Sequence, residues 1–162
     1  MPKWEDLIQQ RDNVLKKHPK TTFIGAHFGS ETLDLQMLAE TLDRYPNFNV
    51  DCAARLRILG RLNPQAVRDF FTKYQNRLLF GTDSDFDKKF ASDEEKKQWQ
   101  NKAARFYSRY LEYFETDRID IIEPYSHAKD WLRLPGVKLP PAVLEKFYHA
   151  NAERLIPGLV KQ

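Results

Sequence analysis

The sequence has little cysteine and no long apolar run, and both absences narrow the possible locations of the protein. Cys52 is the only cysteine among 162 residues, so no disulfide can form within the chain and we expect a reducing, cytoplasmic environment. No segment approaches the roughly 20 consecutive apolar residues that a membrane-spanning helix needs. Residues 1–6 lead into an amphipathic pattern and not into the apolar core of a signal peptide. We therefore expect no membrane partner.

Glycine-rich phosphate loops and one-sided charge are missing as well. Neither GxGxxG nor GxxxxGK[ST] occurs, which removes the common nucleotide-binding loops. The chain has 26 Lys and Arg against 23 Asp and Glu, and the two signs alternate, as they do in residues 93–97. A nucleic-acid-binding domain usually gathers its basic residues on one face. We therefore expect no nucleic-acid partner.

The residues that are present suit one packed domain. Hydrophobic residues make up 41% of the chain, which is too much for a disordered protein. Single domains cluster at roughly 100–150 residues. We predict that residues 1–162 form one domain, since no repeat or linker divides them.

Helix-period and strand-like segments alternate in the first half of the chain. Short connections between such segments are typical of parallel strands joined by helical crossovers, so the fold class is predicted to be α/β. The strands are apolar throughout, which predicts a sheet buried on both faces. The expected segments are helices at 4–17, 35–45 and 64–74 and strands at 22–26, 48–50 and 78–80, followed by a helix at 93–114, an irregular segment at 123–141 and a last helix at 143–155.

Three polar residues follow the predicted strands: His27, Asp51 and Asp83. In parallel α/β folds, ligands and catalytic groups lie at the carboxyl ends of the strands, so these side chains can share one pocket. An imidazole beside carboxylates suits a divalent metal or general acid–base chemistry. Structural roles remain open: a hydrogen-bonded His27, an Asp83 that caps a turn, and an Asp51 that pairs with Arg55 or with a backbone amide.

The other histidines, the cysteine and Ser30 are weaker candidates. His18, His127 and His149 have no second histidine two or four residues away. Cys52 has no CxxC partner, and a buried thiol is the simplest interpretation. Ser30 does not lie in a GxSxG turn, so no esterase nucleophile is indicated.

Taken together, four segments resemble one family. Residues 21–29 (TTFIGAHFG), 45–51 (YPNFNVD), 77–83 (RLLFGTD) and 139–155 are similar, in this order, to motifs of the amidohydrolase-related branch (amidohydrolase 2) of the metal-dependent amidohydrolase superfamily. That branch includes hydrolases and decarboxylases, among them aminocarboxymuconate-semialdehyde decarboxylase. The resemblance covers most of the chain except residues 84–118.

The resemblance implies a (β/α)₈ barrel with one divalent metal ion at its C-terminal face. His27 would end the sixth strand, Asp51 would lie on the seventh and Asp83 would end the eighth. Family members use the histidine at the position of His27 near the metal-bound water, as a catalytic base or a hydrogen-bond partner. They use the aspartate at the position of Asp83 as a metal ligand that can also shuttle a proton. Asp51 is a weaker, substrate-binding candidate. Zinc is the first expectation for the metal and manganese the second, since a site of His and carboxylate ligands accepts either.

The chain also departs from the family pattern. The family binds its metal with an HxH pair on the first strand and a histidine on the fifth, but this sequence has four histidines and no HxH. A complete barrel needs about 200–400 residues and eight strands. We therefore predict a partial TIM-type barrel of three C-terminal βα units and the C-terminal helices, inactive on its own.

Three explanations for a partial barrel remain open. The chain is a piece of a complete enzyme, a protein that completes its barrel by self-association or with a second chain, or a remnant with a non-catalytic binding or assembly role. The predicted function is a metal-dependent hydrolase of a small-molecule substrate. The alternative on the same scaffold is a decarboxylase of an aromatic or unsaturated carboxylic acid.

Overall fold

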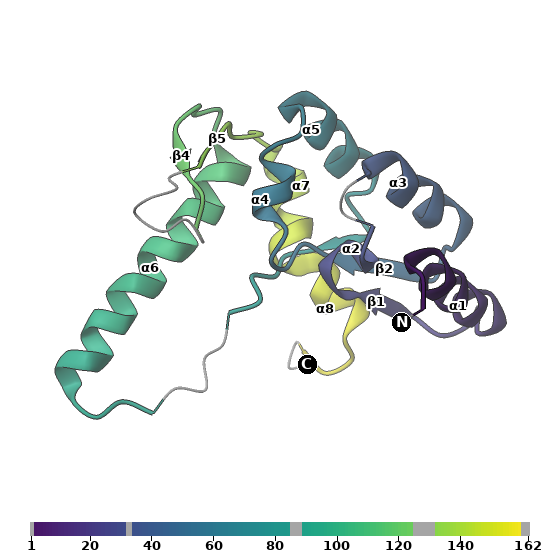
Figure 1. Cartoon of the computed structure of the whole chain (residues 1–162), viewed down its shortest axis with the longest axis horizontal. Coiled ribbons are helices and arrows are strands. Elements are labelled where there is room, and N and C mark those ends of the chain that lie inside the picture. The colour runs from purple at the N-terminus through teal and green to yellow at the C-terminus, as the bar shows by residue number, and fades with distance from the viewer. Residues whose placement is uncertain (1, 32–33, 85–88, 125–131, 160–162) are drawn as a thin grey trace.

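A computed structural model describes residues 2–31, 34–84, 89–124 and 132–159 (Figure 1). Helices and strands alternate in the first half, and a long helix dominates the second. In chain order the elements are α1 (Trp4–Lys17), β1 (Phe23–Gly25), α2 (Ala26–Gly29), α3 (Leu35–Arg44), β2 (Phe48–Asp51), α4 (Leu56–Leu59), α5 (Pro64–Lys73), β3 (Leu78–Leu79), α6 (Asp93–Glu115), β4 (Ile121–Ile122), β5 (Arg133–Leu134), α7 (Pro141–Glu145), the π-helical segment η1 (Lys146–Ala150) and α8 (Asn151–Leu155).

The main sheet has three parallel strands in the order β1-β2-β3. Phe23 pairs with Phe48, and Val50 pairs with Leu78. Helices α2 and α3 lie in the connection between β1 and β2, and helices α4 and α5 lie between β2 and β3. Consecutive parallel strands in chain order, each followed by helix, are the arrangement of neighbouring βα units in a barrel. The predicted α/β class and partial barrel are therefore confirmed.

Side-chain caps explain where the crossover helices begin. Asn63 Oδ1 accepts hydrogen bonds from the backbone amides of Gln65 and Ala66 at 2.9 and 3.1 Å, and Pro64 occupies the first helical position of α5. These contacts satisfy amides that have no partner within the helix. The predicted start of this helix is confirmed.

Aromatic side chains hold the long helix α6 against the rest of the chain. Phe71 of α5, Phe114 of α6 and Phe147 of η1 lie with ring centroids 4.8–5.4 Å apart. All three are at most 2% exposed. The C-terminal half of α6 thus belongs to the core, while its N-terminal half extends away from the sheet (Figure 1).

The last helix is attached to β3 by its side chains and its backbone. Asn151 Nδ2 donates to the carbonyl oxygens of Gln75 and Leu78 at 2.7 and 2.8 Å. The carbonyl of Phe147 accepts from the amide of Phe80 at 2.9 Å, at the place where the helix widens into η1. An external donor on a helical carbonyl accompanies this local widening.

Two details differ from the sequence-based expectations. The segment at 123–141, predicted to be irregular, contributes β5, which pairs antiparallel with β4; strands of two residues are too short to show a period. The sheet is also not buried on both faces throughout, because Ile24 of the edge strand β1 is 40% exposed whereas Phe48 and Val50 of the central strand are buried. Among the described residues, no helix is long and apolar enough to cross a membrane.

Candidate functional site

The carboxyl ends of β1 and β2 are joined through one carboxylate oxygen. Asp51 Oδ1 accepts hydrogen bonds from the backbone amides of His27 and Ala53, at 2.9 and 3.0 Å. Of the structural roles that were open for Asp51, the structure shows the pairing with backbone amides. Asp51 thus fixes where the backbone of His27 leaves the sheet.

The His27 ring is oriented by a second contact at the same strand end. Its Nδ1 lies 2.8 Å from the carbonyl oxygen of Ala53. A carbonyl only accepts hydrogen bonds, so Nδ1 carries the proton in this contact and Nε2 is the basic nitrogen of the neutral ring. The ring is half-buried, and its tautomer suits a general base.

His27 begins a left-handed turn. The φ angles of His27, Phe28, Gly29 and Ser30 are 57°, 56°, 60° and 69°. Each non-glycine residue in this region costs about 1–2 kcal/mol, so the surrounding structure must stabilise the turn. The Phe28 side chain is 0% exposed, and the carbonyls of His27 and Phe28 accept hydrogen bonds from the amides of Ser30 and Glu31 at 3.1 Å. Strained backbone of this kind clusters at functional sites.

Asp83 follows β3 and lies apart from these contacts. Its side chain is exposed, its φ is 61°, and it has no hydrogen bond or ion pair with another described residue. The chain after β3 does run beside the end of β2, because Cys52 Sγ donates to the carbonyl of Gly81 at 3.4 Å. His27 and Asp51 are thus brought together directly, and Asp83 is not joined to them.

The described residues do not form a complete metal site. No group of three or more His, Cys, Asp and Glu side chains among them could hold a metal ion. Catalytic zinc usually has three protein ligands and one water. Asp51 Oδ1 and His27 Nδ1 are also occupied by the backbone contacts described above.

The weaker candidates have structural surroundings. Cys52 is 1% exposed, and burial raises the pKa of its thiol to about 12, so it is not a thiolate at neutral pH. The prediction of a buried thiol is confirmed. His18 ends α1, and His149 Nδ1 lies 3.0 Å from Glu153 Oε1 on an exposed helical face. His127 lies outside the described residues.

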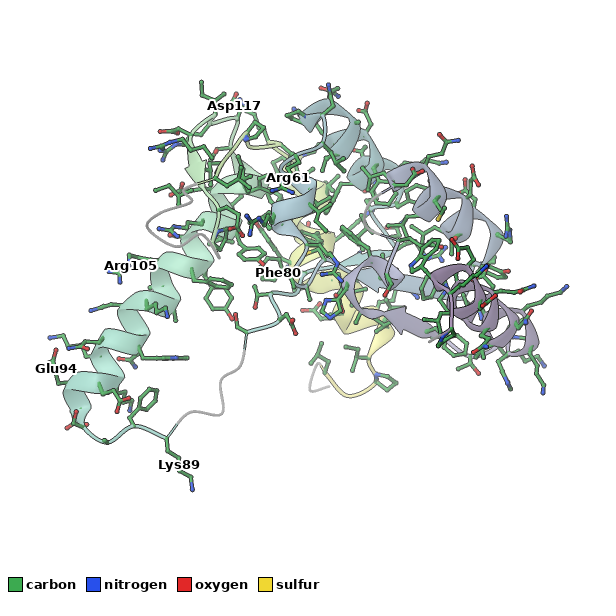
Figure 2. The ribbon with its side chains drawn as sticks, in the orientation of Figure 1. Arg61, Phe80, Lys89, Glu94, Arg105 and Asp117 are labelled. Atoms are coloured by element: carbon green, nitrogen blue, oxygen red, sulfur yellow. The ribbon has the colours of Figure 1, made fainter. Side chains whose placement is uncertain are left out.

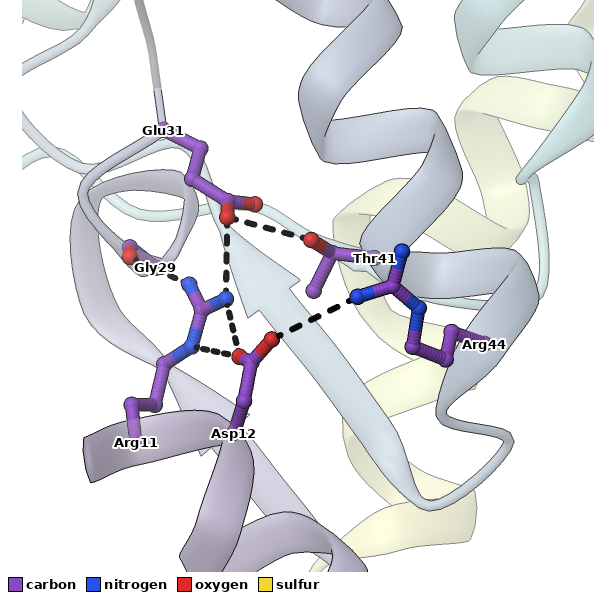
Figure 3. Close-up of polar contacts among 6 residues, drawn as sticks. All are labelled: Arg11, Asp12, Gly29, Glu31, Thr41 and Arg44. Atoms are coloured by element: carbon purple, nitrogen blue, oxygen red, sulfur yellow. Dashed lines mark hydrogen bonds and ion pairs between the residues drawn. The ribbon is translucent and has the colours of Figure 1, made fainter. Parts of the chain in front are cut away.

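Sequence reasoning missed an ion pair between half-buried Arg11 and buried Glu31 that supports the left-handed turn (Figure 3). Arg11 Nη2 lies 2.9 Å from Glu31 Oε1, which also accepts from Thr41 Oγ1 at 3.0 Å. Arg11 Nη1 donates to the carbonyl of Gly29 at 2.9 Å. Burial alone would lower the pKa of Arg11, but hydrogen bonds with Glu31 and Asp12 outweigh it and raise the pKa.

Neither partner of this ion pair carries a local sequence signal, because Arg11 and Glu31 are 20 residues apart. The contacts join α1 and α3 to the residues that follow His27. The catalytic candidate is therefore supported from both sides, by Asp51 and Ala53 in β2 and its loop and by Arg11 in α1.

Comparisons with known proteins show which family the chain is similar to. A family model described as Amidohydrolase matches residues 5–158. Among solved structures, the chain is similar to the uncharacterized TIM-barrel protein Bb4693 from Bordetella bronchiseptica, with 21% sequence identity and a TM-score of 0.45. That alignment covers 91% of this chain and 38% of the Bordetella chain, so the present chain spans less than half of that protein. No curated protein matches at a significant level.

Proposed function

Because the chain belongs to the amidohydrolase family, we propose that it supplies the C-terminal βα units of a barrel that hydrolyses a small-molecule substrate. The family match over residues 5–158 confirms the resemblance seen in the motifs. The observation that carries the reaction is the His27 ring, whose Nδ1 lies 2.8 Å from the Ala53 carbonyl. Barrel enzymes place their catalytic groups at this end of the strands.

His27 is the proposed catalytic base. Nε2 would take a proton from the attacking water, and the ring would then carry a positive charge. The Ala53 carbonyl, which accepts from Nδ1–H, stabilises that charged form. Asp51 is a positioning residue in this scheme, because its carboxylate accepts a hydrogen bond from the His27 amide at 2.9 Å.

Asp83 is the proposed metal ligand on this chain. Amidohydrolases are generally metal-dependent, and zinc or manganese suits a site of histidine and carboxylate ligands. The described residues do not complete such a site. The remaining ligands would have to come from outside them, so the chemistry assigned to this chain is the proton transfer at His27.

The edges of the main sheet favour an assembled barrel over an isolated chain. Among the described strands of the main sheet, β1 and β3 each pair only with β2, which leaves one edge of each without a partner strand in that sheet. Unpaired parallel edges favour association with further strands. We propose that a second copy of the chain, or another chain with the missing strands, completes the barrel.

The proposal is tested by measuring solution mass, bound zinc and manganese, and hydrolysis of a panel of amides, esters and lactones on the same sample. We expect hydrolysis only from an assembly that contains metal. His27→Gln should lower kcat by about 10²–10⁴-fold, the usual contribution of general base catalysis, without loss of metal. Asp83→Ala should lose the metal.

His149→Gln is the matched control, because His149 lies on an exposed helical face beside Glu153. Its activity should equal that of the wild type. Release of CO₂ from aromatic or unsaturated carboxylic acids, without hydrolysis, would replace the proposal with the decarboxylase. If the chain binds neither zinc nor manganese and acts on no substrate, the result would indicate a non-catalytic partial barrel.

A further inference from the structure

A basic hollow lies between helix α6 and the β4–β5 ladder. Its volume is about 280 Å³, and four arginines and two carboxylates contribute to its lining. These residues carry a surplus of two positive charges. The formal net charge of the whole chain is only +3, so most of the excess positive charge is matched in size by this one hollow. The charged residues are Arg105, Arg109, Glu112, Arg118, Asp120 and Arg133.

One arginine engages both carboxylates. Arg118 Nη1 lies 3.5 Å from Glu112 Oε2, and Arg118 Nη2 lies 3.1 Å from Asp120 Oδ1. These contacts join α6 to the chain that leads into β4. Arg118 therefore offsets one of the two negative charges of the hollow. The other three arginines offset the second and leave the surplus of two positive charges.

Those three arginines have few side-chain partners in the part of the chain that the structure describes. Arg133 Nη1 donates to the backbone carbonyl of Asp120 at 3.1 Å, which positions the guanidinium without neutralising it. Arg105 and Arg109 lie four residues apart on α6, and neither side chain has a hydrogen bond or ion pair with another described residue. Like charges at this spacing destabilise a helix. Figure 2 labels Arg105 on α6 and Asp117 just after the end of that helix.

We propose that this hollow binds a phosphate monoester group, held by Arg105, Arg109 and Arg133. A guanidinium presents N–H donors in a planar fork that fits two oxygens of one phosphate. A phosphate monoester carries about −1.5 to −2 charges at neutral pH, which matches the surplus of the hollow better than a single carboxylate does. Four of the six charged residues lie in residues 84–118, outside the family motifs, or at their boundary, so the inference does not depend on the proposed hydrolysis.

The experiment is a calorimetric titration of the full chain with inorganic phosphate, and separately with acetate, at constant ionic strength. The double substitution Arg105→Gln with Arg109→Gln should weaken phosphate binding at least tenfold. The matched control is Lys96→Gln with Lys97→Gln, which removes the same charge from exposed positions of the same helix and should change the affinity less than twofold. Circular dichroism of every variant checks that α6 is intact.

Two further measurements keep the outcome unambiguous. Arg109→Lys keeps the charge but loses the fork, so it should bind phosphate more weakly than the wild type and more tightly than the double variant. His27→Gln should bind phosphate as the wild type does, which separates this site from the proposed catalytic one. Three outcomes would overturn the proposal. They are equal phosphate affinity in the double variant and the lysine control, acetate binding as tight as phosphate binding, and no saturable binding of phosphate.

Discussion

Arg11 and Glu31 form an ion pair of 2.9 Å in which the side chain of Glu31 is 1% exposed. The pair joins α1 to the residues that follow the left-handed turn at His27 (Figure 3). Lys73 and Asp43 form a pair of similar length, 3.0 Å, with both side chains more than half exposed. The two ion pairs differ in burial and not in length. Burial therefore determines how much the free energy of unfolding falls when the cation of each pair is removed.

Arg11→Met should strongly destabilise the protein. It leaves the carboxylate of Glu31 buried without its cation, and breaking a buried pair in this way costs about 3–5 kcal/mol. Lys73→Met is the control and should cost about 0–1 kcal/mol, as exposed pairs do. Urea unfolding followed by circular dichroism measures both, and equal values for the two variants would contradict the assignment.

The carboxylate of Asp51 should stabilise the end of the sheet through its two amide contacts. Asp51→Ala removes the acceptor for His27 and Ala53, and we expect a loss of about 1–3 kcal/mol from two hydrogen bonds. Asp51→Asn keeps an acceptor oxygen and should lose less. Denaturant unfolding compares the two, and an alanine variant as stable as the asparagine variant would show that these contacts contribute nothing.

Gly29 should resist substitution for reasons of both backbone and space. Its φ is +60°, and a Cβ atom there would lie 2.7 Å from Cζ of buried Phe48. Gly158 is the control, because its φ is +80° and a Cβ there would meet nothing within 4 Å. Both alanine variants carry backbone strain of about 1–2 kcal/mol, but only Gly29→Ala adds about 1–3 kcal/mol of overpacking. Thermal unfolding should therefore show a larger fall in Tm for Gly29→Ala than for Gly158→Ala.

Cys52 should be unreactive until the protein unfolds. Burial raises its pKa to about 12, so a thiol reagent at pH 8 should label the native chain far more slowly than the unfolded one. An unfolded thiol titrates near 8.5, so the unfolded state binds fewer protons above that pH. This contribution to stability is complete below about pH 8.5 and is lost as the pH rises toward 12. Over that pH range, the free energy of unfolding of Cys52→Ala should fall less steeply than that of the wild type. Thiol labelling at equal rates in the native and unfolded states would refute the burial of Cys52.

The local features of the fold were predictable from the sequence. Caps and apolar periods depend on neighbouring residues, so Asn63 and Pro64 marked the start of α5 correctly. The strand ends at His27 and Asp51 were found for the same reason, since each follows an apolar run. The family motifs confirmed by the match over residues 5–158 lie in these same segments.

Features that depend on distant residues were not predictable. The pairing of Arg11 with Glu31 spans 20 residues and leaves no periodic trace. The left-handed turn was not predictable because Phe28 is a bulky residue of a type that rarely adopts positive φ. The role of Asp83 as a metal ligand remains a prediction, because it rests on the family motif and not on a contact in this structure.

The strand order of the main sheet also determines how the chain can fold. Each pairing, Phe23 with Phe48 and Val50 with Leu78, closes a loop that contains a whole helix, so no hairpin of this sheet can form first. Asn151 then binds the carbonyl of Leu78 from 73 residues away. Such non-local contacts slow folding, because the chain loses loop entropy before the contacts stabilise it. We therefore expect the three strands and the last helix to gain their stability together, as one cooperative unit.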